Sequence, residues 1–406
     1  MKILLSAYAC EPNRGSEPGV GWNWAKQMAG FADVWVITRL NNKAAIESEL
    51  REHPVPALHF VYYDIATWLR FWKKKERGLY LYYVLWQMAA YVKARKLHDN
   101  HHFDVVHHVT FGNLWLPTFM PFLGIRFIWG PIGGGEQVPI LYRSDYSARA
   151  KFEEFMRDTI LATLSFNPFF LLAFRNADLV LTRTQNTFEK VRGMDRHKRI
   201  KKMVETGVEK QNLFVKSGAK GNRFLKVISV GRLIHWKGLD LAIRAFARAF
   251  GDNSTARMLI VGDGPDKTRL QEICLSERII DKVDFVGYLA HEKVLEHMSQ
   301  SSIFLMPSLK EGGSWVLLEA MTCGLPIICL DIAGASEIVN DKCGIKITPD
   351  TPAKTVQELT GALLKLAHDY GLRKRMGEVG RKRVRSLFCW DKKGEFIREL
   401  YERLDQ

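Results

Sequence analysis

Residues 308–319, Ser-Leu-Lys-Glu-Gly-Gly-Ser-Trp-Val-Leu-Leu-Glu, are the stretch that indicates the fold of this chain. The apolar run 303–307 before it predicts a buried parallel strand, and Ser314 can cap a helix that ends near residues 324–326, Gly-Leu-Pro. A strand, a glycine loop and a helix N-terminus in this order present backbone amides and the positive end of a helix dipole to a ligand. The stretch therefore predicts an anion site on an α/β sheet.

Two carboxylates accompany this site. Glu311 lies in the loop and Glu319 lies about one and a half turns into the helix, so they approach one ligand from different heights. Each can accept hydrogen bonds from paired hydroxyls, one set on a sugar and the other on a ribose. Taken alone, an ordinary β–α turn with a solvated glutamate explains them better. The ligand site is favoured because two glycine segments, 231–238 and 261–265, also follow predicted strands.

The length of 406 residues predicts two domains rather than one. The six cysteines are scattered without a Cys-x-x-Cys pair, which is typical of buried thiols in a reducing cytosol. The apolar start of the chain is short and Glu11 follows it at once, so we expect a core strand there and not a signal peptide. A cytoplasmic location is therefore expected.

The formal net charge of +15 raises nucleic acid or an anionic membrane as partners. Residues 1–220 hold 31 of the Lys and Arg and only 20 of the Asp and Glu residues, so the charge belongs mainly to the first half. Within it, residues 69–97 interleave cations with aromatic side chains, as in helices that lie on a membrane surface. A helix packed on the core with a solvated basic end explains this stretch equally well. Residues 159–174 are uncharged but too few to span a bilayer, which takes about 20 residues.

Alternating strands and helices predict doubly wound parallel sheets in both halves. The predicted strands are 2–10, 34–37, 58–63, 103–110, 177–182, 225–230, 258–261, 283–288, 303–307 and 327–330. The predicted helices include 22–29, 239–250, 267–277, 293–299 and an amphipathic last helix, 390–404.

Three features of the first half could contact a ligand. The loop 11–22 contains Gly15, Glu17 and Gly19, and its glycines let the backbone approach a ligand or another domain. His107 and His108 end a strand, where parallel sheets bind ligands, and consecutive residues point to opposite faces. A single histidine there is more often structural. After a further strand, the glycine stretch 130–135 leads to Glu136, which can accept hydrogen bonds from a polyol.

Taken together, the residues resemble the family 4 (group 1) retaining glycosyltransferases of GT-B fold. The resemblance rests on the segment 231–238 with Arg232 and Lys237, on residues 262–265, on the Glu311–Glu319 pair and on the tryptophan-containing last helix. It implies an α/β chain with two Rossmann-like doubly wound parallel-sheet domains that face each other across a cleft. The expected parts are an acceptor-binding domain 1–206, a nucleotide-sugar-binding domain 207–385 and a helix 386–406 that crosses back to the first domain.

The resemblance also implies roles for single residues. Arg232 and Lys237 would hold the donor diphosphate and stabilise the charge of the leaving group. Glu311 would contact the transferred sugar and Glu319 the ribose. Many relatives carry His-x-His where this chain has His107-His108-Val109, so the implied catalytic set is Glu311, His107, His108, Arg232 and Lys237. The implied donor-binding residues are Gly15, Gly19, Gly231, Arg232, Lys237, Asp263, Tyr288, Gly312, Gly313, Ser314 and Glu319, and Glu17 and Glu136 lie on the acceptor side.

No Asp-x-Asp motif occurs, so we expect no metal and no cofactor besides the nucleotide-diphosphate sugar, which is a co-substrate. The resulting hypothesis is transfer of a hexose from a UDP- or GDP-sugar to a saccharide or lipid-linked saccharide in surface polysaccharide synthesis. An anionic membrane surface at the inner face of the cell membrane is a candidate partner, and no nucleic acid is expected. Alternatives are a GT-B sugar-nucleotide epimerase or phosphorylase and, third, a basic nucleic-acid-binding protein.

Overall fold

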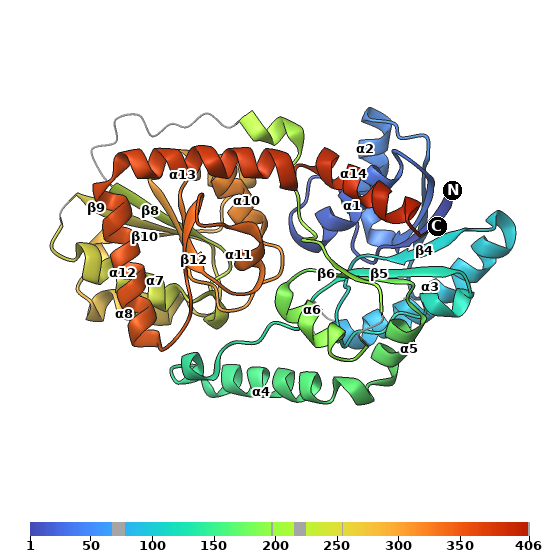
Figure 1. Cartoon of the computed structure of the whole chain (residues 1–406), viewed down its shortest axis with the longest axis horizontal. Coiled ribbons are helices and arrows are strands. Elements are labelled where there is room, and N and C mark those ends of the chain that lie inside the picture. Colours follow the sequence, from blue (N-terminus) through green and yellow to red (C-terminus); the bar gives the residue numbers. More distant parts are fainter. Residues whose placement is uncertain (67–77, 196–197, 215–224, 254, 405–406) are drawn as a thin grey trace. The chain divides into compact units, whose positions relative to one another are not determined.

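The computed structural model describes the 406-residue chain apart from residues 67–77, 196–197, 215–224, 254 and 405–406. Its internal contacts divide the chain into two compact units (Figure 1). Unit 1 contains Met1–Gly135, Asp158–Thr206 and Trp390–Gln406, and unit 2 contains Glu136–Arg157 and Gly207–Cys389. The division after Thr206 coincides with the expected boundary. Residues 136–157, which we expected in the first domain, pack with unit 2.

Unit 1 is built on a seven-stranded sheet in which all neighbouring strands are parallel. Its spatial order is β3 (Leu58–Tyr63), β2 (Asp33–Arg39), β1 (Lys2–Ser6), β4 (Val105–His108), β5 (Arg126–Ile132), β6 (Leu179–Thr182) and β7 (Ile200–Lys202). The order reverses between β1 and β4, as in a doubly wound sheet. This confirms the predicted architecture and adds β7, a short edge strand that the sequence pattern did not indicate.

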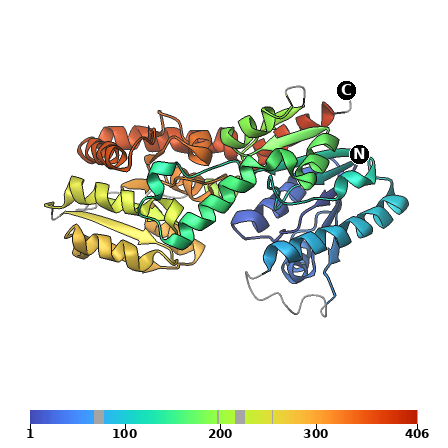
Figure 2. The same cartoon turned by 90° about the horizontal axis from the view of Figure 1, so that it is seen from below.

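The helices of unit 1 follow its strands. They are α1 (Ser16–Met28), α2 (Lys43–Glu52), α3 (Leu79–His101), α5 (Pro168–Asn176), α6 (Gln185–Arg192) and α14 (Trp390–Glu402). α14 packs against α1, so the last helix completes this unit, to which both marked ends of the chain belong (Figure 2). The uncharged stretch 159–174 forms the end of α4 (Ala148–Ala162) and most of α5, where Asn167 caps the helix by accepting from the amides of Phe169 and Phe170.

Unit 2 repeats the same plan with six parallel strands. Their order is β10 (Val283–Gly287), β9 (Ala256–Val261), β8 (Leu225–Val230), β11 (Ile303–Met306), β12 (Ile327–Leu330) and β13 (Gly344–Ile347). The helices are α7 (Leu239–Phe250), α8 (Lys267–Ser276), α9 (His291–Ser299), α10 (Trp315–Thr322), α11 (Ala333–Ile338), α12 (Pro352–His368) and α13 (Tyr370–Arg383).

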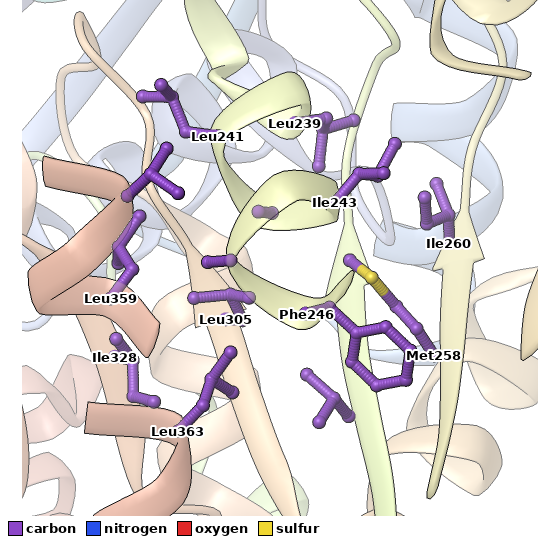
Figure 3. Packing of buried hydrophobic residues seen from close by; sticks show 14 of the residues in the cluster. Leu239, Leu241, Ile243, Phe246, Met258, Ile260, Leu305, Ile328, Leu359 and Leu363 are labelled. Atoms are coloured by element: carbon purple, nitrogen blue, oxygen red, sulfur yellow. The ribbon is translucent and has the colours of Figure 1, made fainter. Parts of the chain in front are cut away.

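The core of unit 2 lies between α7, α12 and the sheet (Figure 3). Helix α7 turns its apolar face, with Ile243 and Phe246, toward Met258 and Ile260 of β9 and Leu305 of β11. Each fully buried side chain of this size contributes about 1.5–3 kcal/mol relative to exposure. The core therefore fixes the ends of β8, β9 and β11, where the glycine loops begin.

Candidate functional site

The glycine loops of unit 2 lie where the strand order of its sheet reverses. β8 pairs with β11 at this point, whereas the chain continues from β8 to β9 and from β11 to β12 on opposite sides. Open α/β sheets bind ligands beyond the carboxyl ends of the two strands at such a reversal. Those ends carry residues 231–238 and 307–314, so the fold brings the two main sequence motifs to one edge of the sheet.

The two loops approach each other closely. Gly238 ends the short 3₁₀ helix η7 (His235–Lys237) with φ of 64°, a conformation that favours glycine. A Cβ atom on Gly238 would lie 2.2 Å from the carbonyl oxygen of Pro307. The backbone amide of Leu309 donates to the carbonyl of Trp236 at 2.8 Å. A side chain at position 238 would therefore force the loops apart.

Lys237 and Glu311 join the loops through their side chains. The Nζ atom of Lys237 donates to both carboxylate oxygens of Glu311, each at 2.6 Å. The two side chains are 13% and 22% exposed, so solvent still reaches the pair. Charge-assisted hydrogen bonds of this kind are roughly twice as strong as neutral ones. A cation and a carboxylate that were predicted to bind one donor thus contact each other.

Helix α11 supports the backbone of the second loop. The amide of Gly334 donates to the carbonyl of Glu311 at 2.9 Å. A Cβ atom on Gly334 would lie 1.6 Å from the carbonyl oxygen of Gly312, so only glycine permits this contact. Sequence analysis did not single out Gly334, because its contact with Glu311 arises only in the fold. The available signal was a glycine a few residues after the predicted strand 327–330.

Helix α10 starts where predicted, but Ser314 does not cap it. Ser314 occupies the N-cap position, and its hydroxyl instead contacts the sulfur of Met306 at 3.8 Å. The predicted side-chain cap is therefore wrong, because the buried hydroxyl points toward the preceding strand. The N-terminus of α10 still follows the glycine pair Gly312-Gly313 directly.

Glu319 of α10 has a partner that the sequence analysis missed. Its Oε1 atom accepts a hydrogen bond from Nε2 of His291, the first residue of α9, at 2.9 Å. This hydrogen bond, together with the charge of Glu319, raises the pKa of His291. The carboxylate expected to bind a ribose is thus held by a titratable side chain.

The remaining donor residues predicted in unit 2 lie at the same edge. Asp263 follows β9, where its carbonyl accepts from the amide of Leu233 at 3.0 Å. Tyr288 follows β10 and is 86% exposed. Gly231 and Arg232 follow β8 directly, and Arg232 is exposed. The structure therefore gathers all the predicted donor residues of this unit beyond β8, β9, β10 and β11.

In unit 1 the first loop differs from the prediction. Helix α1 begins at Ser16 and not at Trp22, so Gly15 is its N-cap and Gly19 is a buried helix residue. A Cβ atom on Gly21 would lie 2.1 Å from the carbonyl oxygen of Ala9. Gly21 permits close packing of α1 against the segment after β1, which explains why the helix contains a glycine there.

Glu17, expected on the acceptor side, is held by Arg183. The Nη2 atom of Arg183 donates to its Oε1 atom at 2.7 Å, and the amide of Phe111 donates to its Oε2 atom at 3.0 Å. Arg183 also forms an ion pair with Glu205 at 3.4 Å and donates to the carbonyl of Pro131 at 2.9 Å. Sequence reasoning missed Arg183, which fixes Glu17 from the end of β6.

The two histidines of β4 are buried, and both are engaged within unit 1. His107 contacts the hydroxyl of Tyr401 through Nδ1 and the carbonyl of Gly130 through Nε2, both at 2.6 Å. His108 contacts Ser6 Oγ at 3.1 Å and Tyr83 Oη at 3.2 Å. Burial lowers the pKa of His107 to about 4 and of His108 to about 3. Both rings thus hold neighbouring elements together in the neutral form.

Glu136, also expected on the acceptor side of the first domain, lies in unit 2 and is 5% exposed. Its backbone carbonyl accepts a hydrogen bond from Nε of Arg157 at 3.0 Å. The negative charge of its side chain acts to raise the pKa of Lys310, the residue before Glu311. The sequence could not indicate this placement, because Glu136 and Lys310 are far apart along the chain.

Comparison with known proteins finds a family match over part of the chain. Residues 209–383 match the family described as "Glycosyl transferases group 1". A stretch of 179 residues is 28% identical to the phosphatidylinositol N-acetylglucosaminyltransferase gpi3 subunit of Schizosaccharomyces pombe, over 44% of this chain. That stretch spans 38% of the relative, less than half of its length.

Two solved structures resemble the whole chain. The sucrose-phosphate synthase of Thermosynechococcus elongatus superposes with a TM-score of 0.70 at 19% identity, over 99% of this chain and 98% of its own. The Anabaena protein HepE in complex with UDP and glucose superposes with a TM-score of 0.63 at 18% identity, over 99% and 100%. At these identities the likeness shows the fold. Residues 209–383 thus match the group 1 glycosyl transferases, and the whole chain has the GT-B fold.

Proposed function

We propose that the protein is a retaining glycosyltransferase that moves a hexose-type sugar from a UDP- or GDP-sugar to a saccharide acceptor. The observation that carries this proposal is the contact of Lys237 with Glu311 at the strand reversal of unit 2, inside the part of the chain that matches the group 1 family. A cation for a diphosphate and a carboxylate for sugar hydroxyls stand side by side there. HepE, which was solved with UDP and glucose, has the same fold.

In the proposed reaction the donor diphosphate binds Arg232 and Lys237, and the sugar hydroxyls donate to Glu311. The bond between the anomeric carbon and the phosphate oxygen breaks, and negative charge develops on the departing diphosphate. The two cations stabilise that charge and do the work that a metal ion does in other transferases. The acceptor oxygen forms its new bond on the same face of the sugar, and its proton passes to the leaving phosphate. The configuration at the anomeric carbon is retained.

The contact between Lys237 and Glu311 prepares this step. Glu311 holds Lys237 next to the loop that carries Gly312 and Gly313. A diphosphate offers Lys237 a larger negative charge than one carboxylate does. Glu311 then accepts hydrogen bonds from the sugar hydroxyls in place of Lys237. Little reorganisation of either loop is then needed before the reaction.

We propose a lipid-linked saccharide as the acceptor, with the protein peripheral on the inner face of the cell membrane. The gpi3 relative acts on phosphatidylinositol according to its name. The stretch 69–97 bears on this proposal. Residues 67–77, with Lys73, Lys74 and Lys75, lie outside the described residues. The rest is α3, whose inner face, with Tyr83 and Trp86, is buried in the core.

The outer face of α3 is apolar, which supports membrane contact. Met88 and Val92, four residues apart and therefore on one face, are 51% and 54% exposed. Beside them Tyr91 contacts Phe122 at a ring distance of 5.9 Å, and Lys93, Arg95 and Lys96 follow in sequence. Apolar side chains next to cations favour an anionic bilayer surface. None of the helices in the described ranges has both the length and the apolar composition for a membrane crossing.

Product analysis tests the proposed reaction against its alternatives. The protein is incubated with UDP- and GDP-hexoses, with and without saccharide acceptors, and with inorganic phosphate. A transferase joins the sugar to an acceptor with retained configuration. An epimerase changes the donor without an acceptor, and a phosphorylase requires phosphate, so either result would replace the proposal. The proposed membrane contact is tested by sedimentation with anionic vesicles. The double variant Met88→Asp, Val92→Asp should bind the vesicles more weakly than the wild type, and equal binding would contradict the membrane contact.

A further inference from the structure

Glu154 of helix α4 contacts both loops that carry Lys237 and Glu311. Its Oε1 atom accepts from Nζ of Lys310 at 2.6 Å and lies 3.4 Å from Nε2 of His235. Glu154 is 1% exposed and Lys310 is 9% exposed, so this is a buried ion pair. Lys310 precedes Glu311, and His235 is two residues before Lys237. A single carboxylate from a distant part of the sequence is thus attached to both halves of the donor site.

The segment that carries Glu154 is anchored in unit 2 by other contacts. Val138, Tyr142, Tyr146 and Ala150 belong to the apolar core of that unit. The hydroxyl of Tyr142 lies 2.5 Å from that of Thr355, and the hydroxyl of Tyr146 donates to the carbonyl of His235 at 3.3 Å. The position of Glu154 therefore does not depend on its own ion pair. It can act as a fixed point for the loops.

Lys310 and Trp236 also connect the two loops to each other. Nζ of Lys310 lies 4.5 Å from the centre of the Trp236 ring, a cation–π contact. Burial, with the nearby charge of Arg157, lowers the pKa of Lys310 to about 8, and Glu154 opposes this decrease. A buried lysine is costly without such a partner, so the geometry of the loop depends on the carboxylate.

We propose that Glu154 is a positioning residue of the donor site, which holds Lys310 and His235 and thereby sets the spacing between Lys237 and Glu311. The proposal rests on the proposed function, since it assigns Glu154 to the same reaction. Glu154 contacts neither of those two residues itself, so it acts through the loops and not on the substrate. A misplacement of about 1 Å can cost roughly a hundredfold in rate.

The test replaces the pair by apolar side chains in the double variant Glu154→Leu, Lys310→Met. The single variant Glu154→Ala would leave a buried lysine without its partner and could fail to fold. The double variant avoids this, because apolar replacement of a buried ion pair is often neutral. Its melting temperature should stay within about 3 °C of wild type. The control is Glu153→Leu, a neighbour on the same helix whose side chain is 47% exposed.

Two measurements decide the proposal. In the double variant kcat should fall about a hundredfold while KM for the donor changes less than about threefold, because misplaced cations affect the transition state most. Hydrogen exchange of residues 231–238 and 308–314 should also become faster without nucleotide, and Glu153→Leu should change neither. A folded double variant with wild-type kcat overturns the proposal. If the wild type transfers no sugar, the proposed function fails instead, and unchanged exchange in the double variant still overturns the positioning role.

Discussion

The ammonium group of Lys237 lies 2.6 Å from both carboxylate oxygens of Glu311, although the two residues are 74 positions apart in the sequence. The pair sits beyond the strand reversal of a doubly wound sheet, where such sheets bind nucleotides. A partly exposed pair of this kind contributes little to stability, so its arrangement matters mainly for what binds there. In the proposed function this pair is the centre of the donor site.

Lys237→Ala should lower kcat more than it weakens donor binding. The negative charge of the leaving diphosphate is largest in the transition state, and loss of one such stabilising group costs about 10²–10³ in rate. Steady-state kinetics with a varied donor concentration would show the split between kcat and KM. Lys354→Ala, which removes a surface lysine paired with Asp350, is the matched control. Unchanged turnover in Lys237→Ala would remove this lysine from the mechanism.

His291 should make donor binding depend on pH. Its pKa is raised by the hydrogen bond to Glu319, so the protonated ring competes for the carboxylate that a ribose needs. Nucleoside diphosphate affinity of the wild type should fall as the pH decreases through the raised pKa, relative to His291→Ala. Calorimetric titrations of both proteins at pH 6 and pH 8 measure this. Equal pH dependence of the two would show that His291 does not compete.

The same pair has a small effect on folding. Because the pKa of His291 is raised in the folded state, its stabilisation is fully present below about pH 6.5 and is lost as the pH rises through the folded-state pKa. It should not exceed about 1 kcal/mol, since half of the His291 side chain is exposed. The difference in free energy of unfolding between wild type and His291→Ala, measured by urea at several pH values, should follow this course.

Tyr401→Phe should destabilise unit 1 without changing catalysis. The variant removes the hydroxyl that lies 2.6 Å from Nδ1 of the buried His107, and an unsatisfied buried polar group costs about 1–3 kcal/mol. Urea unfolding measures the loss, and Tyr370→Phe, at an exposed tyrosine, provides the control. A large decrease in kcat at unchanged stability would mean that His107 takes part in the reaction.

The buried histidines should also make the fold sensitive to acid. Burial lowers the pKa of His107 to about 4 and of His108 to about 3. Below about pH 6.5 the unfolded chain therefore takes up protons that the folded chain does not. Stability should fall by about 2 kcal/mol per histidine between pH 7 and pH 5. In His108→Gln this part of the pH dependence should decrease by about half, and an unchanged slope would contradict the assignment.

Local patterns sufficed for much of the fold. β8, β12 and α7 match their predicted bounds residue for residue, because apolar runs bounded by turn residues leave little choice. β7 and β13 were missed, since each has only three or four residues and lysine interrupts its short apolar pattern. The start of α1 was misplaced because its glycines suggested a loop, whereas Gly21 is required by packing against Ala9 within the helix.

Some residues of the candidate site could be predicted from local sequence motifs, and others could not. Lys237, Glu311 and Glu319 stand in local motifs after strands, where sequence spacing alone places them at one edge. Glu154, Arg183 and His291 reach their partners only through the tertiary fold, over 156 residues in the case of Glu154 and Lys310. A single sequence carries no signal for such contacts, because each of these residues has the local pattern of a solvated charge.

Binding of a nucleotide sugar to unit 2 can be measured with a thermal-shift panel of UDP, GDP, ADP, CMP and their sugar conjugates, each with and without EDTA. A ligand at a hundred times its Kd adds about 2.7 kcal/mol of stability. We expect that one nucleoside diphosphate and its sugar conjugate stabilise the wild type, that EDTA makes no difference, and that Lys237→Ala and Arg232→Ala lose most of the shift. Failure of every nucleotide to stabilise the protein would contradict the proposed donor site.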